Sequence, residues 1–260
     1  MIRDLHMHPH VVKGAENFDA FAETALAKGI TEVCITDHMP LSCSHADDRI
    51  PKGQMRRYYE NALAAKEKWS GKLRVLIGLE VDYHPSFMGE IEDALSVGGL
   101  DLVLGSTHIH AVPGLVEKLG SRTAVARAAL ENEILAAKSG LFDIITHMDM
   151  YRWIFNKPER YPLIDDGYDP ENCTDLADEL FSAINEAGVR LEVNPHLCCS
   201  TGSIGDTYPC PFFIGRAYAR GVRFSYGGDA HHGHEVGTLL PELRAHPVWG
   251  RAIKEFENNK

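Results

Sequence analysis

Short runs of aliphatic and β-branched residues alternate along the whole chain with stretches in which apolar residues recur at helical spacing. The strand-like runs cover residues 2–8, 31–36, 73–80, 100–107, 143–146, 189–194 and 222–226. A helix is predicted after each of these runs. Such a repeat predicts parallel strands joined by right-handed crossovers. We therefore expect a single α/β domain over residues 1–260.

Residues of metal-binding type stand at the C-terminal end of nearly every predicted strand. They are His6, His8, His38, Glu80, His108, His147, Asn194, Asp229 and His231. The first two are two residues apart, so both side chains leave the same face of one strand. Ligands of parallel α/β folds bind at the carboxyl ends of the strands. The sequence therefore predicts that these side chains meet in one site.

Each of these residues also has an ordinary structural explanation. A single buried histidine is more often hydrogen-bonded in the core than bound to a metal, and Asp229 follows two glycines, as a turn residue or helix N-cap does. Taken together, six imidazoles and two carboxylates buried at one edge without a metal would need many partners or large pKa shifts. We therefore expect two or three divalent ions, with Zn, Mn or Fe suited to this donor set.

Composition restricts the partners of such a site. The formal net charge of the 260-residue chain is −11, which argues against binding to long nucleic acid. The chain lacks an apolar run of about 18 residues and an apolar leader before the first strand, so we expect a cytoplasmic protein without a membrane span. The sequence contains no glycine-rich phosphate loop, so a nucleotide cofactor is not expected. Metal-assisted hydrolysis of a small phosphate ester fits best, and the oligomeric state stays open.

Six motifs stand in a fixed order along the chain. They are D-L-H-M-H from Asp4, I-T-D-H from Ile35, G-L-E from Gly78, G-S-T-H from Gly105, I-T-H-M-D from Ile145 and G-G-D-A-H from Gly227. In these motifs the chain resembles the PHP (polymerase and histidinol phosphatase) superfamily, and most of all its histidinol-phosphatase branch. The resemblance covers nearly the whole chain. It implies a distorted (β/α)7 TIM-like barrel and a metal-dependent phosphomonoesterase, with histidinol phosphate as the favoured substrate.

The resemblance also implies a role for each motif residue. The first ion would be bound by His6, His8, Glu80 and Asp229, the second by Glu80, His108 and His147, and the third by His38 and His231. A hydroxide between the ions would attack phosphorus, so that Glu80 and Asp229 count as catalytic residues. His231 or a neighbouring histidine would protonate the leaving alkoxide.

The chain departs from the family pattern at two places. Position 14, where the family has a further ligand to the third ion, is Gly14, and Glu16 is the preferred substitute, with His10 as the alternative. No arginine follows Asn194 closely, so Arg152 is expected to bind the substrate phosphate, because guanidinium groups bind phosphate bidentately. His110 and Asn194 are the other expected substrate contacts. Irregular segments at residues 40–51, 152–168 and 195–211 are expected to surround the substrate.

Three competing interpretations remain open at this stage. A PHP-type phosphodiesterase or nuclease would use the same ligands, although the acidic chain offers no basic stripe for a long polyanion. An amidohydrolase barrel also begins with H-x-H, but its bridging lysine has no counterpart at the middle strands, which end in Glu80 and His108. A regulatory protein with a degenerate metal site is favoured only by Gly14.

Overall fold

The computed structural model describes residues 1–43 and 48–258, and a parallel sheet of seven strands lies at its centre. The strands are β1 (Arg3–Asp4), β2 (Glu32–Ile35), β3 (Arg74–Asp82), β4 (Leu102–Ser106), β5 (Ile144–Ile145), β6 (Arg190–Val193) and β7 (Phe224–Tyr226). Their spatial order follows the chain order, and all neighbouring pairs are parallel. This order results when each strand–helix unit adds its strand beside the preceding one.

The two edge strands approach each other and nearly close the sheet into a barrel. Leu5 N donates to the Tyr226 carbonyl at 3.1 Å, and the His8 N donates to the Ala230 carbonyl at 2.8 Å. In the other direction, Asp229 N donates to the His6 carbonyl at 2.9 Å. The predicted seven-stranded TIM-like barrel is confirmed, and its closing seam carries three of the predicted ligands.

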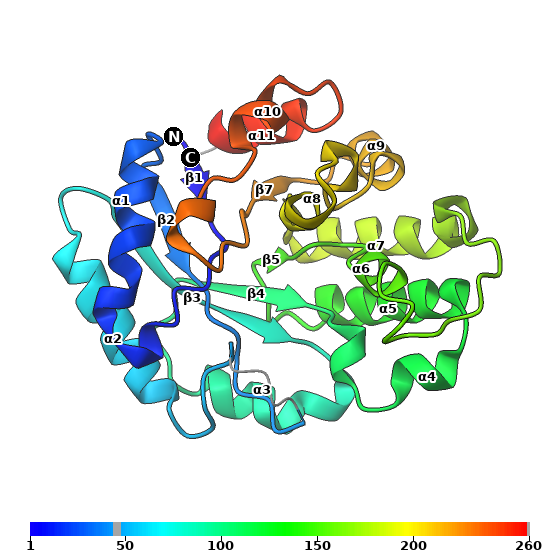
Figure 1. Cartoon of the computed structure of the whole chain (residues 1–260), viewed down its shortest axis with the longest axis horizontal. Helices are drawn as coiled ribbons and strands as arrows, with labels where there is room; N and C mark the ends of the chain where they lie inside the picture. The colour runs from blue at the N-terminus through cyan, green and yellow to red at the C-terminus, as the bar shows by residue number, and fades with distance from the viewer. Residues whose placement is uncertain (44–47, 259–260) are drawn as a thin grey trace.

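Helices cover the outside of the barrel, except for the short α6 and α8, which contribute to a cavity at its C-terminal rim. The helices are α1 (Asp19–Ala27), α2 (Met55–Lys68), α3 (Met88–Leu95), α4 (Leu115–Leu119), α5 (Arg122–Lys138), α6 (Tyr151–Phe155), α7 (Thr174–Ala187), α8 (His196–Thr201), α9 (Pro211–Ala219), α10 (Leu240–Ala245) and α11 (Gly250–Asn258). In Figure 1, α1 and α2 flank one side of the strands and α5 and α7 the other, while α10 and α11 lie beside the two termini. Short 3-10 turns include η1 (Val11–Lys13), η2 (Ala15–Phe18) and η4 (Ile109–Ala111).

The C-terminal helix differs from its prediction. The sequence predicts one helix from about residue 241 to 256, but the structure has α10 and α11 with a break between them. His246 is extended, with φ −73° and ψ 136°. Because it precedes Pro247, the helical conformation is sterically disfavoured there, and the proline offers no N–H to continue a helix. The prediction of one continuous helix is therefore wrong.

Side-chain alternation in the strands places polar groups inside the barrel. On β3, Glu80 and Asp82 share one face and Leu79 and Val81 share the other. All four are buried, because the outer face packs under helices while the inner face meets the polar ends of neighbouring strands. Among the residues that the structure describes, no helix is long and apolar enough to cross a membrane.

Candidate metal centre

The carboxylate of Glu80 lies at the centre of a cluster of buried histidines. Its Oε2 is 2.8 Å from His38 Nδ1, 3.3 Å from His6 Nε2 and 3.5 Å from His8 Nε2. Its Oε1 is 2.9 Å from His147 Nε2 and 3.8 Å from His108 Nε2. Five different strand ends thus bring an imidazole or carboxylate to one point. The strand-end rule predicts this convergence because parallel strands end at the same rim of the barrel.

The last βα connection supplies the other two predicted ligands. Asp229 Oδ1 lies 3.0 Å from His8 Nε2 and 3.7 Å from His6 Nε2. The His231 ring packs against that of His8 with centroids 4.5 Å apart. Asp229 has φ 53° and His147 has φ 24°, a region that non-glycine residues rarely adopt and that is enriched at functional sites. The backbone is held in this conformation where it aims a ligand into the cluster.

The cluster crowds several imidazole nitrogens around one carboxylate. Three of them lie within 3.5 Å of Glu80 Oε2, and His8 Nδ1 is buried without a hydrogen bond in the described part of the chain, which is rare for a buried polar atom. The Nε2 atoms of His6 and His8 face each other at 3.1 Å. Divalent ions would replace the missing protons, and imidazole with carboxylate suits Zn, Mn or Fe. The residues present therefore fit metal ions.

Overlapping groups of these side chains are close enough to share ions. The ligand atoms within each group lie within 4.8 Å of one another; three of the groups are His6, His8 and Glu80, then Glu80, His108 and His147, then His8, His38 and His231. The structure thus brings all eight motif-derived ligands together. It also places Asp82 beside His38 and His108, a neighbour that the sequence analysis did not include.

Charge balance in the cluster keeps the carboxylates ionised. Burial would raise the pKa of Glu80, but His38 and His6 outweigh it and hold that pKa well below its usual range. Burial would likewise raise the pKa of Asp229, and His6 and His196 outweigh it. Burial lowers the pKa of His8, reinforced by His38 and His231. Anionic carboxylates next to a neutral imidazole form a cation-binding set.

Glu192 on β6 orients two of the predicted ligands, and sequence reasoning missed it. Its Oε1 lies 2.8 Å from His6 Nδ1, and its Oε2 accepts from the backbone N of His147 and from Asn194 Nδ2, both at 3.0 Å. Asp82 Oδ1 similarly lies 2.7 Å from His108 Nδ1. Metal-binding histidines commonly donate their other N–H to a carboxylate in this way. A signal existed, because Glu192 and Asp82 each stand two residues from a predicted site residue on the same strand face.

Asn194 and Arg152, two of the predicted substrate contacts, both have partners inside the protein. Asn194 is fully buried, and its Nδ2 also lies 3.2 Å from Asp229 Oδ2, so it orients ligands. Arg152 pairs with Asp149 at 3.1 Å, donates to the Thr207 carbonyl at 3.0 Å and packs over the ring of Tyr208. Its guanidinium therefore has partners within the protein, and binding of the substrate phosphate by Arg152 stays a prediction.

Glu16 and His10 are the two candidates to replace the ligand that is missing at Gly14. A Cβ on Gly14 would lie 2.3 Å from Glu16 Oε1, so the Glu16 carboxylate covers Gly14. Glu16 itself is exposed on η2, and the structure does not bring it into the cluster described above. His10 is half-buried and lies near His231. Burial lowers the pKa of His10, and the charges of Lys13 and His231 lower it further. His10, the alternative to Glu16, is thus the better placed of the two.

A cavity of about 690 Å³ opens above the cluster. His38, His108, Asp229 and His231 form part of its floor. Its walls come from the predicted substrate-facing segments, with Asp48, Arg49, Trp153, Arg160 and His196, and from η4, with His110. Residues 44–47 of the segment predicted at 40–51 lie outside the described residues. His110 lies in the wall, as the sequence predicts, and Arg160 is a cavity arginine that sequence reasoning did not single out.

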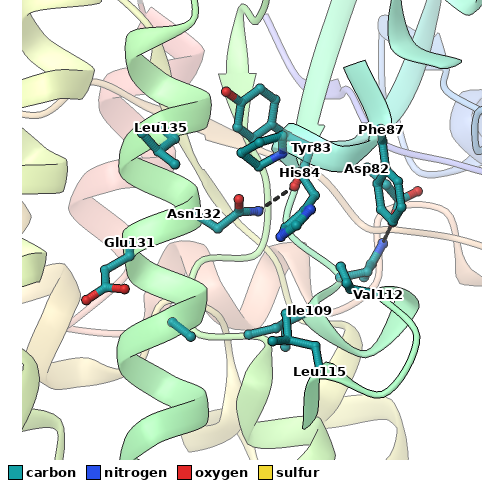
Figure 2. A pocket seen from close by; sticks show the side chains of 13 residues that line it. Asp82, Tyr83, His84, Phe87, Ile109, Val112, Leu115, Glu131, Asn132 and Leu135 are labelled. Carbon is teal, nitrogen blue, oxygen red and sulfur yellow. Dashed lines mark hydrogen bonds and ion pairs between the residues drawn. The ribbon is translucent and has the colours of Figure 1, made fainter. Parts of the chain in front are cut away.

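A second, smaller cavity of about 230 Å³ lies behind His108 and Asp82 (Figure 2). Phe87, Ile109 and Leu115 give it mainly apolar walls, and Leu135 on α5 stands at its side. Its wall includes no other residue from the ligand groups described above. This cavity therefore offers positions for control substitutions near the metal centre.

Glu133 on α5 is a buried carboxyl outside the cluster, and its replacement by glutamine should change the pH dependence of stability. Burial, with Asp149 nearby, raises the pKa of Glu133 well above the usual range of a glutamate, so the folded protein holds this proton more tightly than the unfolded chain. The stabilisation of the folded protein by this bound proton is therefore present at low pH and lost as pH rises toward the folded-state pKa. Between the unfolded-state and the folded-state pKa of Glu133, the free energy of unfolding of Glu133→Gln relative to wild type should therefore increase by about 1.4 kcal/mol per pH unit. Urea unfolding of both proteins at about pH 5 and about pH 7 measures it; an equal difference at both values contradicts it.

Comparison with known proteins gives a consistent result. The model of the PHP domain family matches residues 4–196. A Deinococcus radiodurans protein named "Probable histidinol-phosphatase" is 29% identical, over 96% of this chain and 95% of that protein. The "Histidinol-phosphatase" of Bacillus subtilis is 26% identical, over 90% and 95%. The crystal structure of the histidinol phosphate phosphatase of Lactococcus lactis, in complex with zinc, L-histidinol and phosphate, matches with a TM-score of 0.70 at 18% identity, covering 93% of each chain.

Proposed function

The chain belongs to the PHP domain family, and we propose that it is a metal-dependent phosphatase that hydrolyses L-histidinol phosphate to histidinol and phosphate. Two curated relatives that align with nearly the full chain carry the name of this activity. The observation that carries the proposal is the buried cluster of histidines and carboxylates around Glu80, part of which forms the floor of an open cavity. The complete ligand set argues against a degenerate regulatory protein.

We assign two or three divalent ions to the groups of side chains that share ligand atoms. His6, His8, Glu80 and Asp229 would hold one ion, Glu80, His108 and His147 another, and His38 with His231 a third. When bound, such ions activate water near neutral pH and neutralise the oxygens of a phosphoryl group. The protein contributes fixed positions, because Glu192 and Asp82 lock the orientation of His6 and His108.

The cavity walls supply further groups for a phosphate monoester. Arg160 lines the cavity and packs over the ring of Tyr161 at 5.2 Å, with no carboxylate partner in the described part of the chain. We assign it to the substrate phosphate in place of Arg152, since guanidinium binds phosphate through two parallel N–H groups. His231 Nδ1 lies 3.0 Å from the carbonyl oxygen of Asp229. That contact leaves Nε2 as the nitrogen for a third ion or for the proton that the leaving alkoxide needs.

Phosphate release from L-histidinol phosphate tests the proposed function. The protein would be stripped with a chelator and reloaded separately with Zn, Mn or Fe, and a phosphodiester and a sugar phosphate would be run alongside. We expect rapid release from histidinol phosphate with at least one metal and little from the other two esters. Activity on the diester alone would move the assignment to a phosphodiesterase. Absence of release from any ester with every metal would overturn the phosphatase assignment.

A further inference from the structure

One wall of the large cavity is aromatic. Trp153, on α6, and His110, on η4, both line the cavity, with ring centroids 5.1 Å apart and planes tilted by 35°. Tyr161 also contacts Trp153, at 6.2 Å between centroids, and Lys157 Nζ lies over the Trp153 ring, 5.5 Å from its centroid. Ala111 and Met150 extend the same surface with small or flexible apolar groups. A half-buried tryptophan beside an imidazole offers a flat face on which a planar ring can stack.

A carboxylate without a partner stands elsewhere in the same cavity. Asp48 lines the cavity, and its Oδ1 is buried with no hydrogen bond in the described part of the chain. Its neighbour Arg49 makes its ion pair with Asp82 rather than with Asp48. A buried carboxylate oxygen without a donor is costly, and a cationic ligand would remove that cost. The cavity therefore combines an aromatic wall with a carboxylate that has no ion pair in the described part of the chain, above a floor formed by residues of the metal-ligand cluster.

We propose that this cavity contains a specificity subsite for a phosphate ester that carries both a planar ring and an amine: the ring stacks on Trp153 beside His110, and the ammonium group binds Asp48. The inference rests on the proposed function and adds to it the residues that select the organic part of the substrate. Stacking against an aromatic side chain and a charge-assisted hydrogen bond are independent interactions. Each can therefore be removed separately, and each removal should affect only substrates that possess the matching group.

The test compares three esters with three variants. The esters are L-histidinol phosphate, 2-aminopropyl phosphate, which lacks the ring, and 3-(imidazol-4-yl)propyl phosphate, which lacks the amine. Trp153→Ala should lower the preference for histidinol phosphate over the ringless ester, measured as a ratio of kcat/KM values, about tenfold. Trp153→Phe should restore much of it. Asp48→Asn should lower the preference for histidinol phosphate over the amine-free ester by about thirtyfold, mainly through KM.

Controls separate these effects from loss of structure. Leu135→Ala alters the second cavity and should keep both preferences at the wild-type values. Metal content and thermal unfolding of every variant show whether the centre stays intact, and Trp153→Phe keeps the test valid if the alanine variant unfolds. Unchanged preferences in folded, metal-loaded Trp153 and Asp48 variants would overturn the subsite. If wild type hydrolyses none of the three esters, the proposed function itself fails, which is a different result.

Discussion

Glu80→Gln is expected to remove nearly all activity, with kcat/KM lowered by at least about 10³-fold. One carboxylate approaches five histidine nitrogens, with Oε2 facing three of them and Oε1 the other two. The amide that replaces it is uncharged and directs an NH2 group at one set of nitrogens, so it cannot serve two ions at once. Metal analysis of the purified variant should therefore show fewer bound ions per chain, and phosphate release gives the rate.

A second buried glutamate provides the matched control for Glu80. Glu32 on β2 is also buried, but it pairs with Arg74 at 2.9 Å and belongs to no ligand group described above. Glu32→Gln should keep the wild-type metal content and most of the activity. Equal loss of bound metal in both variants would show that any buried charge matters for folding. A Glu80→Gln protein with full metal content and wild-type kcat/KM would exclude the bridging role.

The strand ends explain why so much of the site was predictable. The position of a side chain at the carboxyl end of a parallel strand follows from the topology alone, because all strands end at the same rim. His38, Glu80 and His147 therefore could be assigned to one site before their distances were known. The same reasoning extends to Glu192 and Asp82, whose alternation with predicted site residues places them on the inner face. They were missed because the prediction considered only the last residue of each strand.

Side chains on irregular segments could not be placed in the same way. Arg152 was predicted from its charge, but its direction depends on Asp149 and on the Thr207 carbonyl, which come from two separate connections. Glu16 and His10 both lie near Gly14, and the turn geometry of η1 and η2, with His10 at φ 55°, decides between them. No periodicity in the sequence records such contacts. The same limit applies to Arg160, whose place in the cavity wall depends on how the segment after α6 returns.

Glu192→Gln is the second substitution with a large expected effect, a 10- to 100-fold weaker affinity for metal. Oε1 of Glu192 receives the ring N–H of His6, while Oε2 receives N–H groups from His147 and Asn194. Every partner is a donor, so a glutamine NH2 meets a donor in either orientation. The amide also removes the negative charge that raises the pKa of His6, which burial would otherwise lower. Titration with Zn in competition with a chelating dye measures the affinity directly.

The comparison with Glu133→Gln makes this test specific. Glu133 is buried as deeply as Glu192, and burial raises its pKa. It does not fix the orientation of a predicted metal ligand, so Glu133→Gln should bind metal with wild-type affinity. Gly227→Ala should reproduce the Glu192 effect without altering any charge, because a Cβ there would lie 1.9 Å from Glu192 Oε1 and 2.5 Å from His6 Cβ. Weak binding in the Glu192 and Gly227 variants together would identify the orientation of His6 as the cause. Wild-type affinity in Glu192→Gln would mean that the strand ends alone hold the ligands in place.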